Sequence, residues 1–169
     1  MPPGELYTVE YLNTVDEPNP GSGYLYDWYG NAIDAYNAGQ SLPGGDFDVL
    51  DVILASPEDW ATVTLPAQFC WTPRGIAGDN YRLYIYSWDA DDVAWTNYLG
   101  NVPCVTITGV PSNWTSGGYF DWWVRVYQGD DPANTPYNYG DGNDTRTAEI
   151  HFTAAGSSPA HEVQTTNKP

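Results

Sequence analysis

PAQFCWTPRGIAGDNYRLYIY (66–86) and CVTITGVPSNWTSGGYFDWWVRV (104–126) are the stretches that decide the fold. In each, apolar and polar residues alternate with period two, which is typical of strands that bury one face. Glycine and proline lie between the short apolar runs, as in β proteins with many turns. No helix signal is strong. The sequence therefore predicts an all-β protein.

These runs resemble the B, C, E and F strands of fibronectin type III domains, which are two-sheet sandwiches of the immunoglobulin-like class. The specific marks are Trp71 before Pro73, Tyr81 in strand C, and Val110-Pro111 ahead of strand F. The resemblance implies an antiparallel β-sandwich over 61–154 that binds, spaces or builds, although a fold alone does not fix function. The expected strands are A 61–65, B 68–72, C 81–87, C′ 93–99, E 104–108, F 119–127 and G 145–153.

The flanks of the sandwich are also expected to be β-rich. The Asp27-Trp28 and Asp121-Trp122 pairs lie about one sandwich-domain length apart in the sequence. Residues 1–60 are therefore interpreted as an additional β-rich segment, either a partial sandwich module or a set of intersubunit strands. Residues 155–169 are interpreted as a tail that is a candidate donor strand.

Isolated strands are unstable, and their unpaired edges favour association. We therefore expect a structural protomer of an extracellular filament or cell-surface assembly. Its partners are other copies of itself, joined head to tail by strand complementation. The flanks are equally explained if the chain is a fragment of a longer tandem array. The alternative function is a carbohydrate-binding or adhesive module of a secreted multidomain protein.

Composition restricts the partners. The chain carries 22 acidic and 5 basic residues, a formal net charge of −17, and 8 Trp and 14 Tyr. Such a charge repels nucleic acids and anionic membranes, and no apolar run is long enough to span a bilayer. We expect no nucleic-acid partner, no membrane insertion, and an extracellular or cell-surface location.

The resemblance places the two cysteines, Cys70 and Cys104, in the neighbouring strands B and E. The apolar residues beside each cysteine are expected to face the core, so both thiols are expected on the outer face. A cross-strand disulfide is geometrically feasible there. The alternative is two unrelated free thiols.

Catalytic and metal motifs are weak. The histidines, His151 and His161, are assigned to an outer strand face and a polar tail, and no nucleophile-elbow motif is present. We expect no enzyme activity. Acidic clusters leave calcium as an alternative to the prediction of no cofactor, but the EF-hand-like opening at Asp141 fails at its sixth and twelfth positions. Those clusters are Asp89, Asp91 and Asp92, and Asp130, Asp131, Asp141, Asn143 and Asp144.

Two further features point to the surface. The sequons at Asn113 and Asn143 fall in expected loops and are candidate glycosylation sites. Exposed aromatic rings can stack on sugars, or can form a subunit interface, where Trp and Tyr are enriched. The outer positions of strands C and F predict such a surface from Tyr84, Tyr86, Trp123 and Tyr127.

Overall fold

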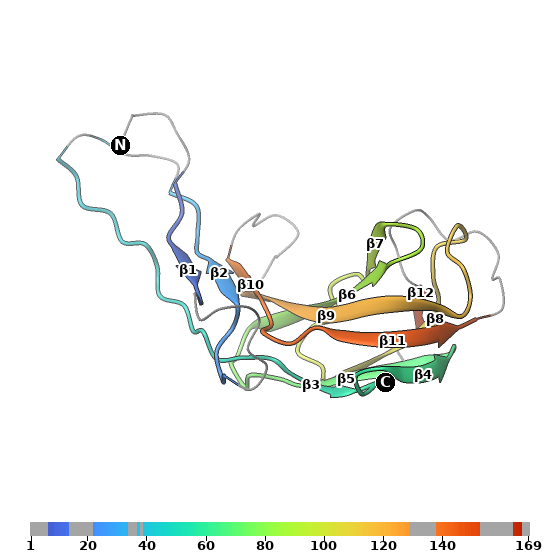
Figure 1. The fold of residues 1–169 in the computed structure, drawn as a ribbon. Coiled ribbons are helices and arrows are strands. Elements are labelled where there is room, and N and C mark those ends of the chain that lie inside the picture. The colour runs from blue at the N-terminus through green and yellow to red at the C-terminus, as the bar shows by residue number, and fades with distance from the viewer. Residues whose placement is uncertain are drawn as a thin grey trace.

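The computed structural model describes residues 7–13, 22–33, 37, 39–128, 138–152 and 164–166. Within these residues the chain forms twelve strands and no helix (Figure 1). The longer strands are rich in β-branched and aromatic residues, which fit a half-buried pleated surface. The strands are β1 (Glu10–Leu12), β2 (Asp27–Tyr29), β3 (Ile53–Ser56), β4 (Ala61–Thr64), β5 (Ala67–Thr72), β6 (Asp79–Ser87), β7 (Asp92–Trp95), β8 (Cys104–Gly109), β9 (Gly118–Gln128), β10 (Tyr139–Asp141), β11 (Arg146–His151) and β12 (Gln164–Thr166).

The strands form two sheets, one of eight strands and one of four. The long strand β9 is the centre of the larger sheet. One edge of β9 pairs with β6, and β6 pairs in turn with β7. The other edge of β9 pairs with β11 near the start of the strand and with β10 near its end. β4 continues the sheet beyond β11, while β2 and β1 continue it beyond β10. The smaller sheet has the order β12-β8-β5-β3.

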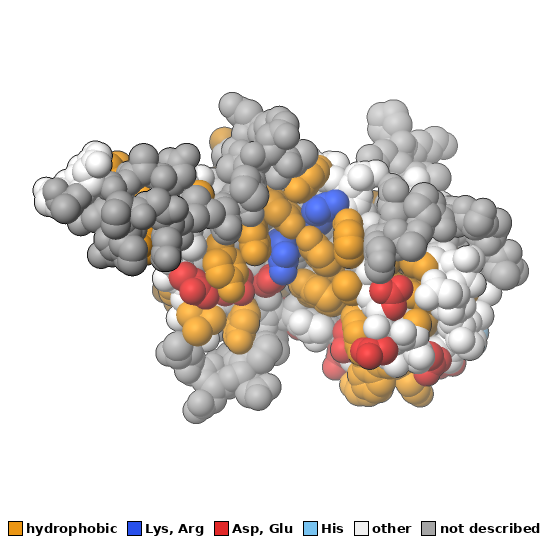
Figure 2. Space-filling model, turned by 90° about the horizontal axis from the view of Figure 1, so that it is seen from above, with side chains coloured by type: hydrophobic (Ala, Val, Ile, Leu, Met, Phe, Trp, Pro, Cys, Tyr) orange, Lys and Arg blue, Asp and Glu red, His pale blue; other side chains and the backbone are white. Residues whose placement is uncertain are grey.

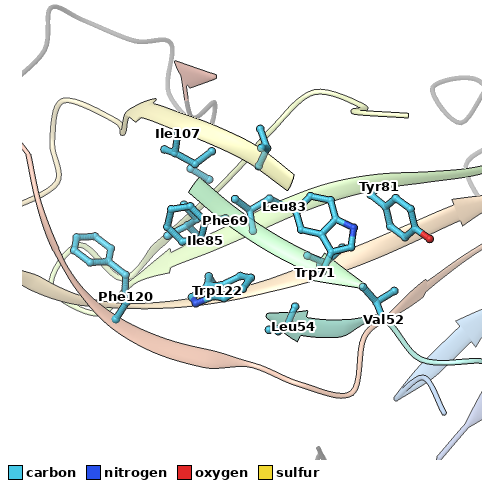
Figure 3. Packing of buried hydrophobic residues seen from close by; sticks show 14 of the residues in the cluster. Val52, Leu54, Phe69, Trp71, Tyr81, Leu83, Ile85, Ile107, Phe120 and Trp122 are labelled. Atoms are coloured by element: carbon cyan, nitrogen blue, oxygen red, sulfur yellow. The ribbon is translucent and has the colours of Figure 1, made fainter. Parts of the chain in front are cut away.

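The core lies between the two sheets (Figure 3). Strand β9 turns Phe120, Trp122 and Val124 inward, and all three side chains are fully buried. From the smaller sheet, Phe69 packs edge-on against Trp122 with ring centroids 5.2 Å apart. Aromatic rings bury large apolar areas, so such pairs dominate the stability of a core. The all-β prediction is confirmed, and strands form at the expected positions of B, C, E, F and G.

The expectation of a fully antiparallel sandwich is wrong at one pair. The strand expected at 61–65 forms as β4, but it runs parallel to β11 in the larger sheet. The smaller sheet begins instead with β3, which is antiparallel to β5. Hydrogen bonds explain the change of sheet, because the Trp60 N–H donates to the Thr147 carbonyl and the Thr147 N–H donates to Asp59 Oδ1. These bonds place the following residues on the free edge of β11.

The flanking residues pair within the chain. β1 and β2, from the segment 1–60, extend the larger sheet through the Tyr29–Tyr139 pair. β3, from the same segment, is an edge strand of the smaller sheet, so 1–60 contributes to both sheets. β12, from the tail 155–169, pairs antiparallel with β8. The terminal strands expected to complete a neighbouring copy therefore have partners in their own chain.

One buried arginine ties the N-terminal segment to the sandwich. Arg74 forms a bidentate ion pair with Asp79, in which both side chains have zero exposure. The same guanidinium donates to the Asp48 and Leu50 carbonyls and lies 5.1 Å from the ring centroid of Trp28. A buried charge is tolerated only when it is paired and hydrogen-bonded, as it is here.

The predicted disulfide is present. Cys70 and Cys104 are directly paired in register between β5 and β8, with Cα atoms 4.1 Å apart. The alternative of two free thiols is therefore excluded. A disulfide is typical of proteins that fold in an oxidising compartment, as the expected extracellular location requires. No helix able to cross a membrane occurs in the described part of the chain.

Candidate functional site

The larger sheet has one surface turned away from the core, which we call the outer face. It carries a row of aromatic and charged side chains from β6, β9 and β10. Because β9 alternates, the residues between its core positions point outward, and β6 and β10 add more rings beside them. Figure 2 shows hydrophobic side chains around basic ones on the side of the molecule seen from above. The outward residues of β9 are Tyr119, Asp121, Trp123, Arg125 and Tyr127.

Two of the predicted surface residues form the centre of this face. Trp123 and Tyr84 are directly paired between β9 and β6, and their rings stack with centroids 5.3 Å apart and planes 16° apart. The Tyr84 and Tyr127 hydroxyl oxygens are 2.8 Å apart and hydrogen-bonded. The sheet therefore places Tyr84, Tyr86, Trp123 and Tyr127 on one face.

The exposure of that set differs from the prediction. Tyr84 is only 9 % exposed and Tyr127 only 7 %, whereas Tyr86 and Trp123 are half-buried. The Arg125 guanidinium covers Tyr84 at 4.9 Å from the ring centroid, and Tyr98 packs edge-on against Tyr127. Tyr84 and Tyr127 are thus a support under the surface, and Tyr86 and Trp123 are the rings that a ligand can reach.

Beside Trp123 lies an open pocket of about 410 Å³. Trp123, Tyr86 and Tyr26 supply rings to its lining. Its polar lining comes from the Asp121, Asp141, Arg125 and Thr145 side chains, and Gly142 completes it. Small-molecule sites combine apolar walls with a few polar groups in this way.

Arg125 is the structural centre of the pocket wall. It donates to both Asp141 carboxylate oxygens, at 2.7 and 2.6 Å, and its guanidinium also lies 4.7 Å from the Tyr139 ring centroid. Burial lowers the pKa of Arg125, but the hydrogen bonds and the negative charge of Asp141 together raise it by more than burial lowers it. The net shift of the Arg125 pKa is therefore upward. Arg125 is therefore charged and already paired.

A second carboxyl group, that of Asp27, is bonded to the Arg125–Asp141 pair through the Asp141 backbone. The Asp141 N–H donates to Asp27 Oδ1 at 2.9 Å. Burial raises the pKa of Asp27 to about 6, against the lowering effect of that hydrogen bond. Burial is also the main cause of the raised pKa of Tyr84. The pocket wall thus has a fixed cation–carboxylate pair, and Asp27, a carboxyl with a raised pKa, lies behind it and is bonded to the Asp141 backbone.

The acidic clusters considered for calcium are used in other ways in the described residues. The Tyr86 hydroxyl donates to Asp91, the Trp114 indole N–H donates to Asp92, and Asp144 pairs with Arg146. Within the described ranges, no group of three or more His, Cys, Asp or Glu could hold a metal ion. Asp130 and Asp131 lie outside those ranges.

The histidines considered for catalysis are placed only in part. His151 lies 3.0 Å from Glu149 through its Nε2 atom, on a half-exposed stretch of β11. Neither His151 nor Glu149 lines the pocket beside Trp123. His161 lies outside the described residues.

The two sequons differ in the structure. Asn113 is exposed, so it stays a candidate for glycosylation. Asn143 is 1 % exposed, and its Nδ2 donates to Ser22 Oγ at 2.6 Å. A glycan on Asn143 does not fit this folded structure, so the expectation of an accessible loop is wrong there. The cause is a distant contact, because the Asn143 N–H also donates to Asp51 Oδ1.

Three exposed rings lie together at the end of β9 where the strand begins, near Gly118. Trp60, Trp88 and Tyr119 contact one another with centroids 5.7 to 6.3 Å apart, and we call them the end cluster. The aromatic surface predicted from the sequence includes none of these three rings. The alternation that turns Phe120 inward places Tyr119 on the face of Trp123, and this signal could have found it. Nothing local indicates the position of Trp60.

A scan of protein-family models and searches of curated proteins and solved structures found no match. The fold and the site define an all-β protein with two sheets, one of them mixed, and an aromatic pocket on the outer face. The pocket offers a ligand ring surface, carboxylate acceptors, the Arg125 guanidinium and the hydroxyl groups of Tyr26, Tyr86 and Thr145.

Proposed function

We propose that this chain is an extracellular binding module, without enzyme activity, that holds a neutral glycan in the pocket beside Trp123. The observation that carries the proposal is the lining of that pocket, which combines three rings with the Asp121 and Asp141 carboxylates. Ring faces pack against the apolar faces of sugars, and carboxylates accept hydrogen bonds from sugar hydroxyls. No single local motif carries this combination, which the sheet assembles from distant parts of the chain.

Charge supports a neutral ligand over an acidic one. Arg125 is the basic residue in the lining, and Asp141 already neutralises it through two hydrogen bonds. Asp121 adds a further negative charge, and the whole chain carries a formal −17. A uronic acid or a nucleic acid would meet this field as a like charge.

The support beneath the pocket favours binding because it orders the rings in advance. Tyr84 stacks on Trp123, and both Arg125 and the Tyr127 hydroxyl hold Tyr84 in place. These residues lie on β6 and β9, which pair along their full shared length. A site on rigid strands loses little conformational entropy when a ligand binds.

Binding to a microarray of neutral and acidic polysaccharides tests the proposal. We expect retention on at least one neutral polysaccharide and a loss of affinity of roughly 30-fold for Trp123→Ala, since truncating a central Trp is typically this costly. Tyr24→Ala is the matched control, because Tyr24 is an exposed ring outside the pocket lining. Thermal unfolding verifies that both variants fold. An absence of glycan binding, or binding that Trp123→Ala leaves intact, would refute the proposal.

The immunoglobulin-like assignment is part of the same proposal. Its support is that β3-β5-β8 and β6-β9-β11 have the A-B-E and C-F-G strand orders of that class, while β12, from the tail, lies on the edge of β8 that strand D occupies in the class. Strand β7 then takes the place of C′. The fibronectin type III resemblance rests on the sequence marks, and in this assignment β3, not the strand expected at 61–65, takes the place of A.

A second candidate is the structural protomer of a filament or surface assembly, joined by strand complementation. Its support is that β12, a strand of three residues from the tail, pairs with the edge of β8 that a strand of another copy would also fit. Sedimentation over a range of concentrations tests it. We expect oligomers that disappear when 156–169 is deleted, whereas a chain that stays monomeric throughout excludes this candidate.

A further inference from the structure

We propose that the glycan is an extended chain that runs along β9, from the pocket beside Trp123 to the end cluster of Trp60, Trp88 and Tyr119. This inference rests on the proposed function and adds the class of ligand, an oligomer in place of a single terminal sugar. It depends on three observations: the exposure of the end cluster, the conformation of Trp60, and the continuity of the outer face.

The end cluster is the most exposed group of large rings in the described part of the sandwich. Trp60 is 61 % exposed, and Trp88 and Tyr119 are each 46 % exposed. Trp60 meets Trp88 at 90° and Tyr119 at 72°, so the rings support one another edge to face. Contiguous exposed aromatic surface on a soluble protein usually marks a binding site.

The backbone holds Trp60 in a conformation that a bulky side chain seldom adopts. Its φ is +60°, in the left-handed region that disfavours residues with a Cβ. The Trp60 N–H donates to the Thr147 carbonyl, and Asp59 accepts from the Thr147 N–H, so two hydrogen bonds fix the turn. Strain that the surroundings enforce is found preferentially at functional positions. Here it keeps the indole beside Trp88 and Tyr119, where the ring remains open to solvent.

The outer face continues without interruption from the pocket to the end cluster. Tyr119 and Trp123 point to the same side of β9 four residues apart, which corresponds to about 13 Å along a strand. Between them, Asp121 lies opposite Tyr86 in register, and both of these residues line the pocket. A single sugar ring cannot contact both ends of this row, so simultaneous contact requires several linked sugars.

The polar surroundings of the end cluster favour a sugar chain over an apolar partner. Glu58, Asp59 and Asp89 are exposed and adjacent in sequence to the two tryptophans. These carboxylates can accept hydroxyl hydrogen bonds. In contact with a second copy of this chain they would face the same acidic groups, and like charges brought together disfavour association.

Calorimetric titration with a length series from the polysaccharide that binds, disaccharide to octasaccharide, tests the inference. We expect wild-type affinity to rise with length. Trp60→Gly and Trp88→Ala should each weaken the longest oligomers by roughly tenfold and leave the disaccharide unchanged. Trp60→Gly is suited to this test because glycine adopts a positive φ without strain, so the fold is retained. Trp123→Ala should weaken oligomers of every length.

The outcomes separate this inference from the proposed function. If affinity does not depend on length, or if both end-cluster variants bind all lengths as wild type does, the extended-chain inference is overturned while the Trp123 pocket stands. If no oligosaccharide binds and Trp123→Ala changes nothing, the proposed function fails first. If the end-cluster variants change only the sedimentation of the protein, the cluster is a contact between copies, and the inference is overturned.

Discussion

Arg74 and Arg125 stand in two regions of the molecule and use the same chemistry to different ends. Each makes a bidentate pair with an aspartate and lies against aromatic rings. The Arg74–Asp79 pair has zero side-chain exposure, whereas Arg125 and Asp141 are 25 % and 17 % exposed. The fully buried Arg74–Asp79 pair joins distant segments of the chain and is part of the fold. The partly exposed Arg125–Asp141 pair forms the wall of a pocket, where a ligand can contact it.

The largest effect is expected from breaking the dry pair. Arg74→Met leaves the Asp79 carboxylate buried without a cation, which typically costs about 3–5 kcal/mol of unfolding free energy. Urea denaturation measures the loss. The double variant Arg74→Met with Asp79→Asn removes the orphaned charge, so it should recover part of the stability. Equal stability of the single and double variants would show that the charge is not the cause.

A smaller effect on stability is expected at the partly exposed Arg125–Asp141 pair. In Arg125→Met the Asp141 carboxylate gains access to water, so the loss should be about 1 kcal/mol. The same denaturation series measures it beside Arg74→Met. Glycan titration should show a larger change in binding free energy than in stability. The pocket lining loses its cation, and Asp141 loses the hydrogen bonds that fix its orientation. A stability loss as great as that of Arg74→Met would contradict the difference drawn between the two regions.

The smallest effect is a pH dependence confined to the Arg125 network. Burial raises the folded pKa of Asp27 to about 6, above its ordinary value of 3.8, so the folded state binds more protons between these values. The contribution of Asp27 to stability is therefore fully present below pH 3.8 and is lost as pH rises through 6. Asp27→Asn should remove about 1 kcal/mol of this dependence after allowance for solvent screening.

Urea denaturation of wild type and Asp27→Asn from pH 4 to pH 7.5 measures that contribution. The variant should gain stability relative to wild type as pH increases. Parallel curves for the two proteins would show that Asp27 is not the titrating group. Trp88→Ala is the control, since it removes an exposed ring that contacts Trp60 and Tyr119 and changes no titrating group.

What could be predicted from the sequence follows from alternation. The period of two in β9 correctly separated Phe120 and Trp122, in the core, from Trp123 on the outer face. Alternation also directed the Cys70 and Cys104 thiols outward, and the resemblance to fibronectin type III domains implied that their strands are neighbours; the disulfide between them is present. These successes depend on residues that are close in the chain or in directly paired strands.

What could not be predicted depends on contacts between distant segments. Nothing near Arg74 indicates that it meets the Asp48 carbonyl and the Trp28 ring, and nothing near Asn143 indicates that Ser22 covers its amide. The parallel pairing of β4 depends likewise on two hydrogen bonds, from the Thr147 N–H to Asp59 and from the Trp60 N–H to the Thr147 carbonyl. The filament, the glycan at Asn113 and calcium remain predictions.

The four arginines have one further consequence, for proteolysis. Arg74 and Arg125 pair with aspartates, Arg146 pairs with Asp144 and donates to carbonyls of 54–57, and Arg82 donates to the Thr96 carbonyl. The remaining basic residue, Lys168, precedes a proline at the chain end. A protease that cuts after arginine therefore finds these four side chains engaged until the sheets open, and its rate of cleavage at them reports how often the sheets open.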